Sequence, residues 1–161
     1  MSPAIQVAVC GPRDCSEDDW VNAHEVGSLL ARQGAVVICG GLSGAMAAVA
    51  AGARSAGGTV VGILPDTDRT DAGPDLTVAI PTGLGEARNN LVVNSGNAVI
   101  VIGGSWGTLS ELALAMCRER VPVVQLGGWR VLDEGDQPLP GIIHAKSPVA
   151  AIAATGLWPD A

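Results

Sequence analysis

The segment from residue 98 to residue 116, AVIVIGGSWGTLSELALAM, limits the fold more than any other part of the chain. It opens with a continuously apolar and largely β-branched run, which is typical of a strand buried on both faces of a parallel sheet. Gly103 and Gly104 favour a sharp turn after that run, and from Gly107-Thr108 onward apolar residues recur at helical spacing. The segment therefore predicts a strand, a glycine-rich loop and a helix in direct succession.

Such a loop brings backbone N–H groups and the positive end of a helix dipole to the carboxyl edge of a sheet, where a phosphate can bind. The same order of residues occurs in VVICGGLSGAM, residues 36–46. Glycine-rich turns also arise where a strand and a helix only pack closely, and their serines and threonines can be simple turn or cap residues. The residues expected to bind the ligand are Gly40, Gly41, Ser43, Gly44, Gly103, Gly104, Ser105, Gly107 and Thr108.

Apolar runs and turn residues alternate along the whole chain, which predicts strands that alternate with helices. This order favours an α/β fold: a Rossmann-like, doubly wound, mostly parallel sheet with helices on both faces. At 161 residues the chain is expected to form a single domain, 1–161. The expected strands are 5–10, 35–39, 59–64, 76–80, 98–102, 121–126 and 142–145, and the expected helices are 16–34, 44–55, 86–94, 108–119 and 148–155.

Composition excludes several classes of function. A net charge of −7 without clustered Lys or Arg argues against nucleic-acid binding, so backbone dipoles and one or two Arg must hold any phosphate. The four cysteines form no CxxC pair and lie far from both histidines, so no metal site is expected. Without a secretory signal or an apolar run long enough to span a bilayer, the sequence predicts a cytoplasmic protein with no membrane partner.

Four segments occur in order along the chain: CGGLSGAM (39–46), GGTVVGILP (57–65), GEARNN (85–90) and GGSWGTLSE (103–111). Together they resemble the Lonely Guy (LOG) group and its relatives, the molybdenum-cofactor carrier proteins. The resemblance covers most of residues 5–126. LOG enzymes typically have Pro-Gly-Gly where this chain has Gly103-Gly104-Ser105, and Arg-Lys where it has Arg88-Asn89, so the chain looks more like the carrier branch.

The resemblance implies a homodimer or homotetramer that binds a phosphorylated nucleoside-like small molecule, with residues 86–94 and 108–119 as the expected interface. In LOG enzymes the residues that match Arg88 and Glu111 hydrolyse the N-glycosidic bond of a nucleoside 5′-monophosphate, and the reaction requires no cofactor. The carrier relatives imply instead a non-catalytic protein with molybdenum cofactor or a nucleotide as its ligand. Relatives are often labelled lysine decarboxylases, but Lys146 is the only lysine and its position does not fit a pyridoxal phosphate Schiff base.

The roles of the polar residues stay open at this stage. Arg88 can bind a phosphate or a polar base edge, with Asn89 in support, or can be a surface charge of little energetic consequence. Glu111 can act at the ribose, or it can close a capping box with Thr108 at its own helix terminus.

Overall fold

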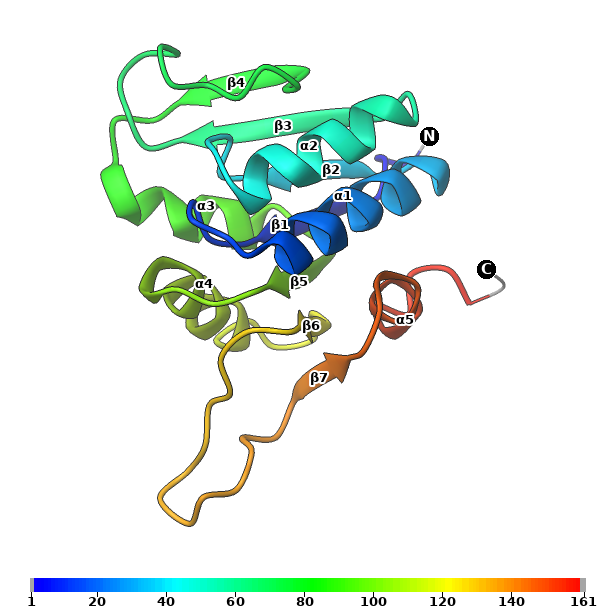
Figure 1. Ribbon diagram of the computed structural model, residues 1–161, viewed down its shortest axis with the longest axis vertical. Coiled ribbons are helices and arrows are strands. Elements are labelled where there is room, and N and C mark those ends of the chain that lie inside the picture. The colour runs from blue at the N-terminus through cyan, green and yellow to red at the C-terminus, as the bar shows by residue number, and fades with distance from the viewer. Residues whose placement is uncertain (1, 160–161) are drawn as a thin grey trace.

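The computed structural model describes residues 2–159, which form one seven-stranded sheet with five α-helices and one 3-10 helix (Figure 1). The strands are β1 (Gln6–Cys10), β2 (Val36–Cys39), β3 (Thr59–Leu64), β4 (Val78–Pro81), β5 (Ala98–Ile102), β6 (Val123–Leu126) and β7 (Ile142–Ala145). The helices are α1 (Glu17–Arg32), α2 (Ala45–Ser55), η1 (Gly85–Arg88), α3 (Asn89–Asn94), α4 (Trp106–Met116) and α5 (Pro148–Ala154).

The sheet has the strand order β4-β3-β2-β1-β5-β6-β7, and every adjacent pair of strands is parallel. The chain runs outward from β1 to β4, returns to the centre at β5, and then runs outward to β7. This confirms the predicted doubly wound α/β fold, with the reversal of strand order between β1 and β5. Ligands of such sheets bind in the crevice outside the carboxyl ends of the strands at that reversal.

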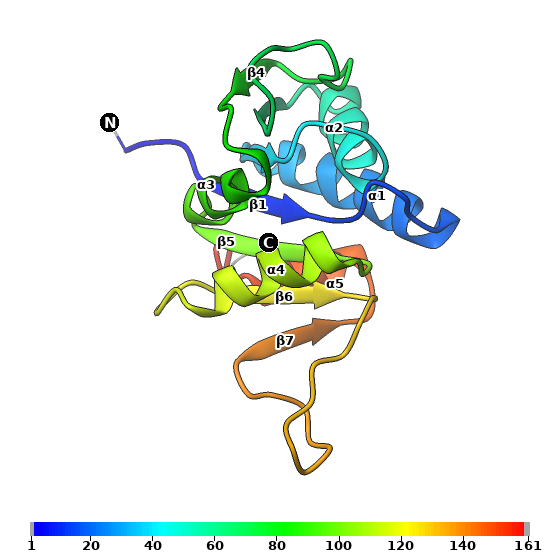
Figure 2. The same ribbon diagram turned by 90° about the vertical axis from the view of Figure 1, so that its left-hand side faces the viewer.

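Helices cover both faces of the sheet, as predicted. Val7 and Val9 of β1 pack with α1, α2 and α5 on one face, whereas Ala8 and Cys10 pack with α3 and α4 on the other. Figure 2 shows α3 and α4 in front of the sheet and α5 behind it. All five residues of β5 are buried, which accounts for the unbroken apolar run in its sequence.

The start of α4 differs from its predicted position. The helix begins at Trp106, because the Ser105 side chain caps it: the Thr108 amide donates a hydrogen bond of 3.2 Å to Ser105 Oγ. Glu111 therefore lies more than a turn beyond the cap, and its interpretation as a capping-box partner of Thr108 is wrong. The expected helix over 86–94 begins instead as the 3-10 helix η1 and continues as α3, and α4 ends at Met116 rather than at 119.

Two sets of hydrogen bonds join α3 to α4. The guanidinium of Arg118, just after α4, donates to the carbonyl oxygens of Val93 and Gly96. At the other end of these helices, Asn89 Nδ2 donates to Ser110 Oγ at 3.2 Å. The two elements that carry Arg88, Asn89 and Glu111 are thus tied together at both ends.

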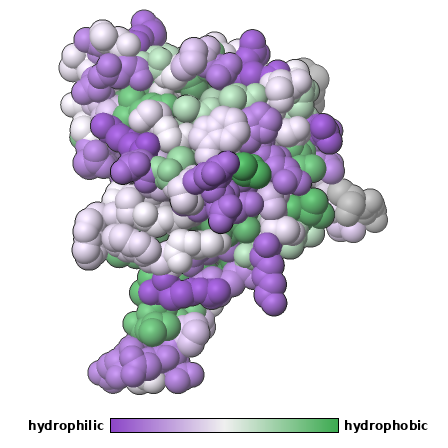
Figure 3. Space-filling model, viewed as in Figure 1, coloured by the Kyte–Doolittle hydropathy of each residue, from purple (hydrophilic) through white to green (hydrophobic). Residues whose placement is uncertain are grey.

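Residues 127–141, between β6 and β7, extend away from the rest of the protein as an arm (Figure 1). An antiparallel bridge between Leu132 and Pro138 closes the arm, and its tip is hydrophilic (Figure 3). Within residues 2–159, none of the helices has the length and hydropathy needed to cross a bilayer.

Candidate functional site

A cleft of about 650 Å³ opens beside the β1–β5 reversal. Its walls come from the loop after β1, from η1 and the start of α3, and from the first two turns of α4. A cleft of this volume is within the range of small-molecule and cofactor sites. It is lined by Gly11, Pro12, Arg13, Asp14, Met46, Glu86, Arg88, Asn89, Ser105, Trp106, Gly107, Thr108, Ser110 and Glu111.

Arg88 and Glu111 form a buried ion pair in this cleft. Arg88 Nη1 lies 3.9 Å from Glu111 Oε1, and the two residues are only 4% and 6% exposed. Such a distance is too long for a hydrogen bond, so neither group satisfies the hydrogen-bonding capacity of the other. Burying two charges is costly unless further partners complete their hydrogen bonding. Both groups therefore retain capacity to bind a polar ligand.

The protonation of Glu111 reflects its burial. Desolvation raises the pKa of its carboxyl to about 7, whereas the charge of Arg88 and a hydrogen bond from the Cys10 thiol lower it. A carboxyl with this pKa is divided between its acid and carboxylate forms near neutral pH, which suits a group that accepts or donates a proton. Burial likewise raises the pKa of the Cys10 thiol, and the charge of Glu111 raises it further. Cys10 is therefore a neutral thiol at neutral pH.

Asn89 orients the cationic side of the site. Its Oδ1 accepts a hydrogen bond from Arg88 Nη1, and its Nδ2 lies 3.4 Å from Glu86 Oε2. Within residues 2–159, Arg88 Nε is buried and has no hydrogen-bond acceptor. A buried guanidinium N–H without a partner is costly in free energy.

The N-terminus of α4 supplies backbone donors. The Thr108 amide is taken by Ser105 Oγ, whose hydroxyl also lies 3.0 Å from Thr108 Oγ1. The amides of Trp106 and Gly107 in the first turn have no intrahelical acceptor. Gly107 lines the cleft, and a β-carbon added there would meet no heavy atom closer than 3.9 Å. Space for an anion thus exists at this end of the helix.

The loop of Gly40, Gly41, Ser43 and Gly44 does not line the cleft. A β-carbon on Gly41 would lie 2.7 Å from Leu64 Cδ2, and one on Gly44, where φ is +65°, would lie 2.2 Å from the Arg13 carbonyl oxygen. These glycines allow close packing of backbone against backbone. The prediction that this loop binds the ligand stays a prediction, and the lining of the cleft does not include it.

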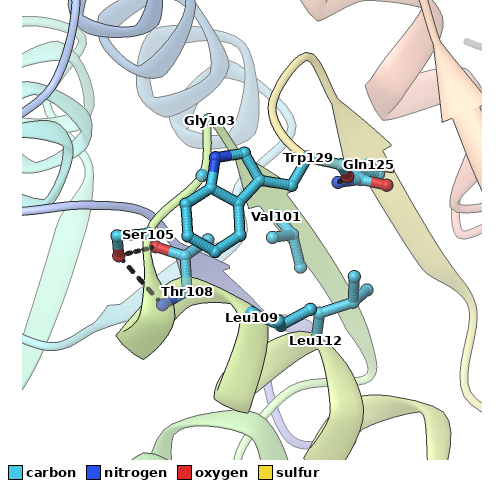
Figure 4. Close-up of a pocket in the computed structure, with 9 residues that line it drawn as sticks. Val101, Gly103, Ser105, Thr108, Leu109, Leu112, Gln125 and Trp129 are labelled. Carbon is cyan, nitrogen blue, oxygen red and sulfur yellow. Dashed lines mark hydrogen bonds between the residues drawn. The ribbon is translucent and has the colours of Figure 1, made fainter. Parts of the chain in front are cut away.

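Gly103 and Gly104 also lie outside the cleft. They line a separate pocket of about 10 Å³, too small for anything larger than a water molecule. The indole of Trp129 covers this pocket above the start of α4 (Figure 4), and a β-carbon on Gly104 would lie 2.5 Å from Trp129 Cδ1. Of the residues predicted for the site, those that the structure brings to the cleft are Arg88, Asn89, Ser105, Gly107, Thr108 and Glu111.

Sequence reasoning missed the loop after β1, where Gly11, Pro12, Arg13 and Asp14 form one wall of the cleft. Gly11-Pro12 directly follows the expected strand 5–10 and carries no ligand-binding signal of its own, and its place next to β5 depends on the strand order. Trp106 was missed as well, because the expected helix begins at residue 108, two residues after the start of α4. Among residues 2–159, no group of three or more His, Cys, Asp or Glu side chains is arranged to hold a metal ion.

The model of the SLOG cluster4 family matches residues 4–152. A molybdenum cofactor binding protein from Rippkaea orientalis superposes with a TM-score of 0.86 at 35% identity, covering 95% of this chain and 96% of that one. The molybdenum cofactor carrier protein of Chlamydomonas reinhardtii superposes with a TM-score of 0.81 at 35% identity, covering 94% and 96%. A cytokinin riboside 5′-monophosphate phosphoribohydrolase from Mycobacterium tuberculosis is 38% identical over 69% of this chain and 64% of its own length.

Proposed function

The chain belongs to the SLOG cluster4 family, and on that premise we propose that its cleft binds a phosphorylated nucleoside-like ligand and hydrolyses the N-glycosidic bond of a nucleoside 5′-monophosphate. The observation that carries this proposal is the buried pair of Arg88 and Glu111 in the cleft, 3.9 Å apart. Both residues match those that act in LOG enzymes.

Binding draws on the few positive groups of an acidic protein. The first turn of α4 offers the amides of Trp106 and Gly107, and the cleft contains the cations Arg13 and Arg88. These local donors suit one phosphate group, whereas a net charge of −7 disfavours a polyanion. The ligand class is therefore a small monophosphate rather than a nucleic acid.

The chemistry draws on the protonation of Glu111. In the net reaction the oxygen of water bonds to the ribose C1′, the bond from C1′ to the base nitrogen breaks, and a proton from the water ends on the base. A carboxylate near the ribose stabilises the oxocarbenium-like charge at C1′, and it can take the proton from the attacking water. With burial raising the pKa of Glu111 to about 7, turnover that needs the carboxylate rises with pH through neutrality.

The test incubates the purified protein with purine, pyrimidine and N6-substituted adenine monophosphates, and measures free base and ribose 5-phosphate by chromatography. We expect equal amounts of the two products. Glu111→Gln should reduce turnover by roughly a hundredfold or more and leave substrate affinity nearly unchanged. Arg88→Ala should weaken both. Glu25→Gln removes one acidic group from the exposed side of α1, far from the cleft lining, and serves as the matched control.

A second function, binding and transfer of intact molybdenum cofactor, is supported by a different observation. The cofactor-binding protein of R. orientalis and the C. reinhardtii carrier protein match nearly the whole of this chain, whereas the M. tuberculosis hydrolase matches 69% of it. The cofactor is then a cargo, and its phosphate and polar pterin edge need the same donors in the cleft.

The two functions differ in measurable ways. Transfer of an intact cargo predicts that protein purified from cells that synthesise the cofactor contains molybdenum and pterin in equal amounts. It also predicts that no monophosphate releases free base, and that Glu111→Gln does not change the bound content. Release of base by the parent protein, lost in Glu111→Gln, decides for hydrolysis.

A further inference from the structure

Resting on the proposed function, we propose that Trp106 is the stacking surface for the planar heterocycle of the ligand, whether that ring is a nucleobase or a pterin. Trp106 is the first residue of α4, its side chain is 78% exposed, and it lines the cleft that contains Arg88 and Glu111. The site therefore selects ligands that carry a flat aromatic ring beside their phosphate.

The exposure of Trp106 is unusual within this chain. The sequence has no Phe or Tyr and four Trp, and Trp106 is the most exposed of the large hydrophobic side chains. Covering an exposed indole with a ligand removes apolar surface from water, which is favourable in free energy. Aromatic rings supply π-faces for bases of any kind, so stacking tolerates different heterocycles.

A contact with Trp129 holds the Trp106 ring in place. The two ring centroids are 5.0 Å apart and the planes meet at 82°, a T-shaped arrangement. A T-shaped contact engages an indole at one edge or one face, so Trp129 leaves at least one face of Trp106 uncovered. The contact favours one orientation of the exposed Trp106 ring before a ligand binds, which lowers the entropic cost of stacking.

Trp129 is itself anchored. Its backbone carbonyl accepts a hydrogen bond from the buried side chain of Gln125, and its ring lies against Gly104 where any β-carbon would intrude. Figure 4 shows the indole of Trp129 above Ser105 and Thr108, with Gln125 beside its backbone. Because Gly104 has no side chain, the ring of Trp129 can pack against it. Trp129 in turn contacts Trp106.

The experiment compares three phosphorylated ligands, of which two carry an aromatic heterocycle and one does not. Calorimetry measures the affinity of the parent protein and of Trp106→Leu for adenosine 5′-monophosphate, for neopterin monophosphate, and for ribose 5-phosphate, which has no aromatic ring. Where hydrolysis would interfere, both proteins carry Glu111→Gln. We expect Trp106→Leu to weaken binding of the preferred ring-bearing ligand about tenfold or more and to leave ribose 5-phosphate affinity unchanged.

Two further variants make the result specific. Trp106→Phe keeps an aromatic face and should recover most of the lost affinity. Trp20→Leu removes a half-exposed indole of α1 that stacks on His24 and does not line the cleft, and it should bind like the parent. Because Trp106 is so exposed, its replacement should leave thermal unfolding nearly unchanged.

The outcomes separate the inference from the proposed function. A parent protein that binds the ring-bearing ligand while Trp106→Leu binds it equally well overturns the stacking role alone. Equal losses for the ring-bearing ligand and for ribose 5-phosphate also overturn it, because they indicate a general disturbance of the cleft. A parent protein that binds none of the phosphorylated probes overturns the proposed function and this inference together.

Discussion

Gly40 lies directly against the guanidinium of Arg88: a β-carbon on Gly40 would lie 2.9 Å from Arg88 Nη2 and 2.5 Å from Met46 Sδ. The glycine-rich loop after β2 thus contacts Arg88, which lines the cleft. Its lack of a side chain leaves room for the buried cation.

Gly40→Ala should therefore displace Arg88 and Met46. Overpacking of this kind costs about 1–3 kcal/mol, so we expect a corresponding fall in the free energy of unfolding in urea. Ligand affinity measured by calorimetry should fall as well. Gly135→Ala, in the exposed arm, is the control, because its β-carbon meets only Asp133 Oδ1 at 3.3 Å. Unchanged affinity in Gly40→Ala would show that Arg88 does not depend on this contact.

The dependence of stability on pH should report the burial of Glu111. Desolvation raises the pKa of Glu111 from 4.5 to about 7 in the folded protein, so between these values the folded state binds the proton more tightly than the unfolded state. The contribution of Glu111 to stability consequently falls as pH rises from 4.5 to 7 and is constant outside that window. As the pH rises through this window, the free energy of unfolding of Glu111→Gln, measured in urea, should increase by up to about 3 kcal/mol relative to that of the parent protein. Parallel pH profiles for the two proteins would contradict a raised pKa.

Gly107 and Gly104 should respond differently to the same substitution. The β-carbon of Gly107→Val has free space at the mouth of the cleft, whereas that of Gly104→Val would displace the ring of Trp129. We expect Gly107→Val to unfold within about 1 kcal/mol of the parent and to lose phosphate-ligand binding. Gly104→Val should lose stability. Retained affinity in a folded Gly107→Val protein would exclude the first turn of α4 as the anion site.

The expected homodimer or homotetramer can be tested on η1 and α3. Leu91 of α3 lies in the expected interface 86–94 and is 41% exposed, and Leu84, just before η1, is 51% exposed. If this surface is the subunit interface, Leu91→Glu buries a charge and should weaken assembly by about tenfold or more. Light scattering at micromolar concentration measures the mass, with Val21→Glu on exposed α1 as the control. A monomeric parent protein that still binds ligand would contradict the prediction.

The sequence carried enough information to predict the fold, because the signals for parallel strands are local. Residues 98–102 are continuously apolar, and the structure buries all of them as β5. The residues at which helices begin were harder to predict from the sequence. Ser105 caps α4 through its own hydroxyl, a contact that competes with the equally good cap pattern at Thr108 until the backbone geometry is known.

The site was predictable only where family resemblance or helix periodicity pointed to single residues, as for Arg88 and Glu111. Which other residues line the cleft depends on the order of the strands in the sheet. Two loops with the same glycine pattern have different roles because β5 carries its helix to the cleft, whereas the loop after β2 passes behind Arg88. The wall formed by Gly11-Pro12-Arg13 follows from the pairing of β1 with β5, a long-range contact that no local pattern encodes.

The hydrogen bonds between α3 and α4 join two neighbouring walls of the cleft. Arg118 donates to the carbonyls of Val93 and Gly96, and Asn89 donates to Ser110, so the backbone segments that carry Arg88 and Glu111 are held beside each other. We therefore expect adaptation to ligands of different width to come from the opposite side, the loop after β1. Redesign of ligand preference should accordingly begin at Arg13 and Asp14 and leave the two tied helices intact.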